Sequence, residues 1–298
     1  MNTRHRQRRG RGFTLVELVV VIVVGAIIAA TLAVFLRPAL DAYLGSRSRA
    51  ELSAQAGHAM QRMVRDLRVA VPNSVRSPDA NCFEAIPSLT GGRARKGPDT
   101  VNDSGPGCSP GANCSAPMDT GQALTAIDVL TPLSATPAVG DWVVVDNQNP
   151  GDVYGGGNRA AITSVSTPNA AYGRTRLGFT GFSLPPGFDS ARFVVVPNAQ
   201  QAVFYVCAGA DGTLDASGNG RGTLVRLRAY GFNASAPSAC PATTGGAVLA
   251  SGVVSCRFLY SPNQGATQQN GFVALQLELA RDNERASLVM GAHVVNAP

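Results

Sequence analysis

The first residue that suggests specific chemistry is a lone carboxylate, Glu17. It lies in the apolar run of residues 13–36 (FTLVELVVVIVVGAIIAATLAVFL), which carries no other charge. If this run enters a membrane, the carboxylate costs about 2–4 kcal/mol. A buried carboxylate also needs an opposite charge nearby. A charge at that cost predicts a functional role for Glu17.

The second reactive set is the six cysteines, which all lie beyond the apolar run. None forms a C-x-x-C pair. They are Cys82, Cys108, Cys114, Cys207, Cys240 and Cys256. An even number of cysteines favours disulfides if this region is exported, and buried free thiols if it is cytosolic. Cys108 and Cys114 are close enough for a small loop, and Cys207 could pair with Cys240 or Cys256.

The remaining reactive side chains form no enzyme motif. The histidines His5, His58 and His293 are far apart, and no G-x-S-x-G, Walker or H-E-x-x-H pattern occurs. The segment 211–219 offers oxygen donors that could hold calcium, but it lacks the spacing of an EF-hand, which favours a hairpin tip. We expect a protein that is not an enzyme and needs no cofactor or metal.

The apolar run is long enough to cross a membrane. Its 24 residues span about 36 Å as a helix, against about 30 Å of hydrocarbon. Five arginines precede it and predict a cytoplasmic N-terminus. The alternative is a signal peptide cleaved after Ala29 or Ala30, but the apolar core of a signal peptide is only about 7–15 residues long.

The positive charge of the chain is concentrated in its first twelve residues. Beyond them, 20 basic residues balance 19 acidic ones. A nucleic-acid-binding domain needs a basic face, so we expect no nucleic-acid partner. The 33 glycines and 19 prolines favour many turns and short strands over a helical bundle.

Helical periodicity continues past the apolar run. Apolar side chains recur at steps of three or four over residues 39–70, and charged side chains fill other positions. Pro38 predicts a kink rather than an end, whereas Pro72 and Asn73 predict the end. We expect one long helix, with a transmembrane half at 13–36 and an amphipathic half at 37–71.

Residues 72–298 predict a β-rich head. Within it, 74–123 is a Gly/Pro-rich insert that we expect to be irregular and held by a disulfide. Short strands are predicted at 127–130, 141–146, 160–165, 176–180, 192–196, 202–207, 223–229, 253–260, 272–280 and 286–294. Residues 273–280 alternate apolar side chains with small or polar ones, as a half-buried strand does. The fold class is α+β, with a largely antiparallel sheet.

Residues 11–17 (RGFTLVE) resemble the type IV prepilin processing motif, in which G-F-T-L-x-E precedes an apolar helix. The resemblance implies that prepilin peptidase removes residues 1–12 by cutting between Gly12 and Phe13, and that Phe13 is N-methylated. It implies one span of the bacterial inner membrane, a cytoplasmic N-terminus and a periplasmic head. Glu17, fifth in the mature chain, would pair with the N-terminal amine of a neighbouring subunit.

Segments further along resemble the MshO family of minor pilins, from the mannose-sensitive haemagglutinin (MSHA) pilus. They are 62–76, 82–95, 139–145 and the end of the chain from 250. This resemblance implies a ladle-shaped minor pilin or pseudopilin that acts in pilus assembly or priming and enters a pilus. Its implied partners are prepilin peptidase, the major pilin, other minor pilins, the inner-membrane assembly platform and membrane lipid. The alternative is a pilus-tip adhesin or a type II secretion pseudopilin on the same anchor.

Overall fold

The computed structural model describes residues 12–103, 108, 114–184, 187–262 and 270–296. It divides the chain into two compact units, Met1–Ala50 and Glu51–Pro298. The helix α1 (Leu15–Arg68) begins in the first unit and ends in the second, which holds every strand of the described residues. Every strand pairing in the described part of the chain is antiparallel. The predicted α+β class is therefore confirmed.

In the first unit, α1 exposes apolar side chains on all sides. Its most apolar stretch has a mean hydropathy of 3.1, and none of that stretch is buried. By length and composition, α1 can cross a membrane. Pro38 lies inside the helix without ending it, as predicted.

In the second unit, residues 51–68 of α1 bury one face. The buried apolar side chains recur at steps of three or four and are Leu52, Ala56, Ala59, Met60, Met63 and Leu67. They share a hydrophobic core with inward-facing residues of the largest sheet. This one-sided burial matches the predicted periodicity over residues 51–68, whereas the apolar side chains of residues 39–50 are not buried, and the helix ends slightly earlier than predicted, at Arg68.

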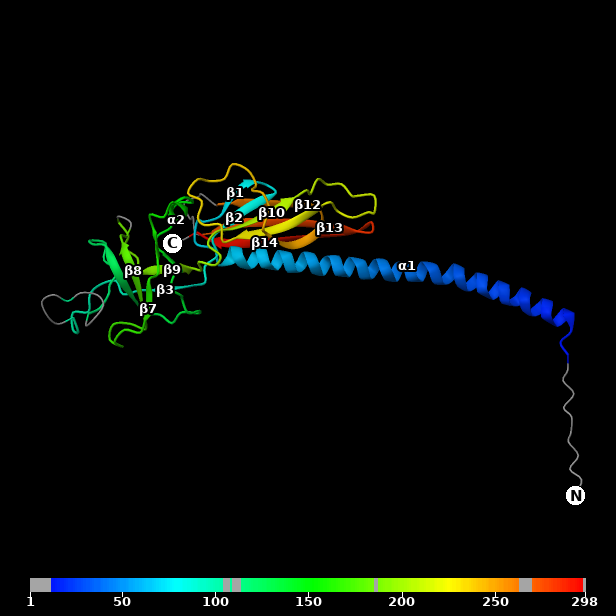
Figure 1. Cartoon of the computed structure of the whole chain (residues 1–298), viewed down its shortest axis with the longest axis horizontal. Coiled ribbons are helices and arrows are strands. Elements are labelled where there is room, and N and C mark those ends of the chain that lie inside the picture. The colour runs from blue at the N-terminus through cyan, green and yellow to red at the C-terminus, as the bar shows by residue number, and fades with distance from the viewer. Residues whose placement is uncertain (1–11, 104–107, 109–113, 185–186, 263–269, 297–298) are drawn as a thin grey trace, which may run out of the picture. The chain divides into compact units, whose positions relative to one another are not determined.

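Seven strands form the sheet that receives this helical face, and Figure 1 shows its long strands β12, β13 and β14 together. The sheet order is β1-β2-β10-β11-β12-β13-β14. The strands are β1 (Arg76–Asp79), β2 (Cys82–Ala85), β10 (Val203–Ala208), β11 (Gly222–Arg228), β12 (Ala247–Ser261), β13 (Asn270–Arg281) and β14 (Glu284–Val295). In β13, Val273, Leu275 and Leu277 are fully buried, which confirms the predicted alternation.

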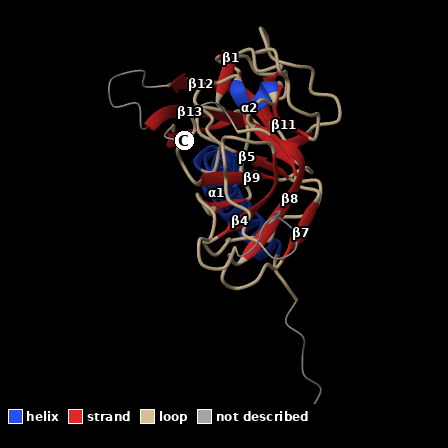
Figure 2. Cartoon of the chain, turned by 90° about the vertical axis from the view of Figure 1, so that its left-hand side faces the viewer, coloured by secondary structure: helices blue, strands red, loops and turns tan. Residues whose placement is uncertain are grey.

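Two smaller sheets form the rest of the second unit (Figure 2). One has the order β3-β9-β5-β6 and the other β4-β8-β7. Their strands are β3 (Thr90–Arg93), β4 (Leu124–Val129), β5 (Trp142–Val144), β6 (Arg159–Ala161), β7 (Ser164–Ser166), β8 (Thr175–Phe182) and β9 (Arg192–Val196). The two sheets share a core of their own. A short helix, α2 (Asp152–Gly155), lies between β5 and β6.

The prediction of an irregular region at 74–123 is wrong in part, because β1, β2 and β3 lie within it. β2 sits inside the large sheet, and its residues Phe83 and Glu84 are fully buried. Strands of four residues are too short to show alternation, and β2 is fixed by pairing with β10, which is remote in sequence. The single strand predicted at 160–165 is also wrong, because β6 and β7 join different sheets.

Candidate functional site

Gly12 and Phe13 lie just before α1, in a segment without regular structure. Phe13 is 78% exposed, and a Cβ atom added to Gly12 would meet nothing within 4 Å. The peptide bond between them is therefore sterically open. The leader arginines lie outside the described residues.

Glu17 lies in the first turn of α1 and faces back to Thr14. The backbone N–H of Glu17 donates to Thr14 Oγ1 at 3.3 Å, and the backbone N–H of Thr14 donates to Glu17 Oε2 at 3.5 Å. Although both contacts are long for hydrogen bonds, they form the reciprocal pattern of a capping box. The pattern T-x-x-E at 14–17 would have predicted this role, which the sequence reasoning missed.

All six cysteines are paired in the structure. The pairs are Cys82–Cys240, Cys108–Cys114 and Cys207–Cys256, with Cα–Cα separations of 5.8, 5.7 and 6.5 Å. These separations fall in the normal range for disulfides. The small loop expected from Cys108 and Cys114 is present, and Cys207 pairs with Cys256 rather than Cys240.

Two of the disulfides fasten the large sheet. Cys82 is the first residue of β2, and its partner Cys240 lies in the connection between β11 and β12. Cys207 in β10 is joined to Cys256 in β12, and these strands flank β11. Segments that are remote in sequence are thus covalently tied around the middle of the sheet.

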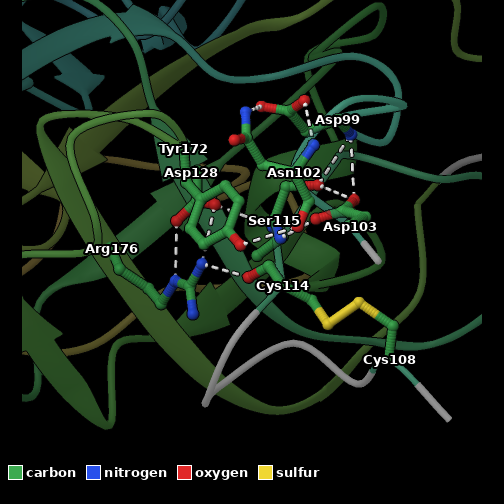
Figure 3. Close-up of a disulfide and its surroundings, with 10 residues drawn as sticks. Asp99, Asn102, Asp103, Cys108, Cys114, Ser115, Asp128, Tyr172 and Arg176 are labelled. Carbon is green, nitrogen blue, oxygen red and sulfur yellow. Dashed lines mark hydrogen bonds and ion pairs between the residues drawn. A yellow bond between two sulfur atoms is a disulfide. The ribbon is translucent and has the colours of Figure 1, made fainter. Parts of the chain in front are cut away.

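The remaining disulfide, Cys108–Cys114, is anchored by a buried ion pair between Asp128 and Arg176, which Figure 3 shows beside it. Arg176 on β8 donates from Nε to Asp128 Oδ1 at 2.6 Å and from Nη2 to Asp128 Oδ2 at 2.8 Å. The same Nη2 donates to the carbonyl of Cys114 at 2.7 Å. The hydrogen bonds that Arg176 donates to Asp128 raise the pKa of Arg176, so the pair stays charged. This ion pair fixes one end of the disulfide to β4 and β8.

A second set of hydrogen bonds holds the chain on both sides of the loop that Cys108 and Cys114 close. Asp103 accepts from the backbone N–H of Ser115 at 2.7 Å and from its hydroxyl, and the hydroxyl bond is the main cause that lowers the pKa of Asp103. The hydrogen bond from the Asn102 side chain lowers the pKa of Asp99. Asp103 also lies near Cys108 and Cys114, but their sulfurs are bonded to each other and offer no thiolate to a metal.

A buried polar cluster attaches α1 to the large sheet. Asp66 of α1 accepts from the hydroxyl of Tyr205 at 2.7 Å and forms an ion pair with Arg226 at 2.7 Å. Burial is the main cause that raises the pKa of Tyr205, and the Asp66 carboxylate adds to it. The phenol therefore remains protonated and donates to the carboxylate. Sequence reasoning missed this cluster because Asp66 is more than 130 positions from Tyr205 and from Arg226 along the chain.

The candidate calcium loop is a hairpin tip. Asp211 accepts from the backbone N–H and the hydroxyl of Thr213, and Asp215 accepts from the backbone N–H groups of Ser217 and Asn219. These hydrogen bonds hold the loop in the form of a turn between β10 and β11.

The two histidines in the described part of the chain lie on different elements. His58 is exposed on α1, and His293 is exposed on β14 with its ring against Phe272. Trp142 is partly buried and packs edge-on against Phe232. We find no grouping of these residues that would make a catalytic site in the part that is described.

Comparison with known proteins gives one match. The family described as the prokaryotic N-terminal methylation motif matches residues 7–33, which include Gly12, Phe13 and Glu17. No curated protein sequence and no solved structure matches the chain. The chain thus carries a type IV pilin-like prepilin signal at the start of an apolar helix, an arrangement that fits a single-pass membrane anchor.

Proposed function

We propose that this protein is a minor pilin or pseudopilin that takes part in the assembly or priming of a type IV pilus. The observation that carries the proposal is the methylation motif at residues 7–33, which leads directly into the apolar part of α1. A helix that is apolar on all sides suits both lipid and the helix-packed core of a filament. The long helix followed by an antiparallel head supports the same function.

In this proposal, prepilin peptidase cuts between Gly12 and Phe13 and the new amine of Phe13 is methylated. The five leader arginines favour a cytoplasmic N-terminus, which sends the head to the periplasm. Three disulfides agree with an oxidising compartment.

Glu17 is proposed to serve assembly. After cleavage, its carboxylate would neutralise the Phe13 amine of a neighbouring subunit inside a bundle of apolar helices. Because an unpaired ion there costs several kcal/mol, the pair would also set the axial offset between two subunits. The partners are then the major pilin, other minor pilins and the assembly platform.

The resemblance of residues 62–76 and 139–145 to MshO-type minor pilins supports an MSHA-like system. A pilus-tip adhesin is the second candidate. It is favoured by the two smaller sheets, which have their own core and provide a surface beyond what is needed to cover α1. We propose no catalytic role.

The test is the mature N-terminus, read by mass spectrometry from cells with and without prepilin peptidase. Methylated Phe13 is expected only when the peptidase is present. Gly12→Val should block the cut, because a side chain is added beside the scissile bond. Gly10→Val, the same change two residues earlier, should be processed normally. A mature N-terminus near Ala30 would show a signal peptide instead and would overturn the proposal.

A further inference from the structure

A cleft of about 440 Å³ opens in the second unit where α1 ends. Its walls come from the last residue of α1 and the chain after it, from β3 and β9, from the end of β5 and the residues after it, and from the end of β14. The apolar part of the wall includes Val69, Val194 and Val295. Val69 is 41% exposed and Val295 is 50% exposed, so this apolar surface is open to solvent. The volume is in the range of small-molecule sites, about 300–1,000 Å³.

Three arginines, Arg68, Arg93 and Arg192, line the same cleft. Arg93 and Arg192 are directly opposite each other on β3 and β9. Like charges in that position repel each other and destabilise the sheet. Within the described residues, none of the three guanidinium groups forms an ion pair with a carboxylate. The cleft therefore combines an apolar wall with positive charge that its surroundings do not neutralise.

One carboxylate, Asp146, also lines the cleft, but it is already engaged. It accepts from the side-chain amide of Gln148 at 2.6 Å. A single carboxylate cannot balance three guanidinium groups, so a net positive charge remains.

Hydrogen bonds join the segments that form the wall of the cleft and fix them relative to one another. The side-chain amide of Asn73 donates to the carbonyl of Asn147 at 2.8 Å and to that of Asn296 at 3.0 Å. The side-chain amide of Asn147 donates to the carbonyl of Pro72 at 2.6 Å. These bonds tie the chain after α1, the chain after β5 and the end of β14. A site formed in advance binds a ligand at a lower ordering cost.

We propose that this cleft binds a small amphiphilic anion, with a carboxylate or phosphate head on a short apolar body. Arg93 and Arg192 hold the head, since guanidinium groups pair with either oxyanion in a bidentate manner. The apolar body lies along Val69, Val194 and Val295. Binding of an anion also removes the repulsion between the two strands. The proposal does not depend on pilus assembly, because every wall residue belongs to the second unit.

The experiment uses the full chain in nanodiscs of uncharged phosphatidylcholine. Hexanoate and hexyl phosphate are the probes, measured by equilibrium dialysis, and a diazirine analogue of hexanoate maps the site by peptide mass spectrometry. Three compounds serve as controls: hexanol lacks the negative charge, hexylammonium carries a positive charge instead, and acetate lacks the apolar body. We expect at least one probe to bind at least tenfold more tightly than every control, and cross-links in residues 68–72, 91–93 or 192–194. Preference for one probe identifies the head group.

The variant Arg93→Gln/Arg192→Gln should weaken probe binding at least tenfold. Without ligand, it should raise the melting temperature, because the like charges are removed. Arg257→Gln, which neutralises an exposed arginine on β12 outside the cleft, should change neither quantity. If the double variant loses its disulfides, Arg192→Lys replaces it and should weaken binding while the charge is kept. Any of four results would overturn the proposal: wild-type binding by the variants of Arg93 and Arg192, binding of hexanol equal to that of the probes, cross-links spread over the head, or no binding of either probe.

Discussion

At the scale of a single residue, Glu17 has one role seen in the structure and a second that is proposed. In the isolated chain its carboxylate accepts from the backbone of Thr14 and caps α1. In a filament it is proposed to meet the amine of a neighbouring chain. The first role needs only a hydrogen-bond acceptor, whereas the second needs a negative charge. A glutamine at this position keeps the acceptor and removes the charge, so the two roles can be separated.

Glu17→Gln and Glu17→Ala should both insert into the membrane, be processed at Gly12 and fold the head. Neither should enter filaments, because both lack the charge that pairs with the amine of Phe13. The measurement is the amount of each variant in the inner membrane and in sheared filaments, next to wild type. If Glu17→Gln enters filaments as well as wild type while Glu17→Ala does not, capping is the role that matters.

Asp66 and Glu51 are two acids of α1 that pair with arginines of the large sheet. Asp66 and Arg226 are almost fully buried, whereas Glu51 and Arg281 are about half exposed, at 49% and 44%. Asp66→Ala should reduce the free energy of unfolding of the head by about 3–5 kcal/mol, because the Arg226 charge stays buried without its main partner. Glu51→Ala should cost less than about 1 kcal/mol. Urea denaturation of full-length protein in detergent compares them, and equal midpoints would contradict this account of the cluster.

At the scale of elements, the disulfides differ in how much chain they close. Cys82–Cys240 spans 158 positions and Cys108–Cys114 spans six. In the entropic model, the first stabilises by about 5 kcal/mol and the second by about 2 kcal/mol. The double variant Cys82→Ala/Cys240→Ala should therefore lower the melting temperature more than Cys108→Ala/Cys114→Ala. The reverse order would show that the small loop contributes through its anchor at Asp128 and Arg176 instead.

The sequence predicted those elements whose own residues carry a pattern. The apolar part of α1 and the alternating residues of β13 are long enough to show their periods. β2 could not be predicted, because its four residues depend on hydrogen bonds from β10. The partner of Cys82 could not be predicted either, because its distance from Cys240 depends on the path of the strands between them. The capping box at Thr14 was readable and was overlooked, while the cleft depends on segments that only the fold brings together.

At the scale of the whole molecule, the proposed topology determines the redox state of the head. Exported protein should have no free thiol, whereas protein made without residues 1–36 should stay in the reducing cytosol with six. Alkylation before and after reduction, followed by mass spectrometry, counts the thiols in each preparation. Oxidised cysteines in both preparations would remove the link between disulfides and export, and six free thiols in the exported protein would refute the periplasmic location.

The disulfide between Cys82 and Cys240 also sets how far the head can stretch. In the proposed pilus the head would bear tension, and a chain pulled out of its fold extends to about 3.4 Å per residue. The 158 positions between these cysteines correspond to roughly 540 Å of extended chain. When the chain is pulled at its ends, the disulfide prevents this segment from being extended. The oxidised head should therefore show a much shorter extension under force than the reduced one, and the mechanical load would pass directly from β2 to the residues that lead into β12.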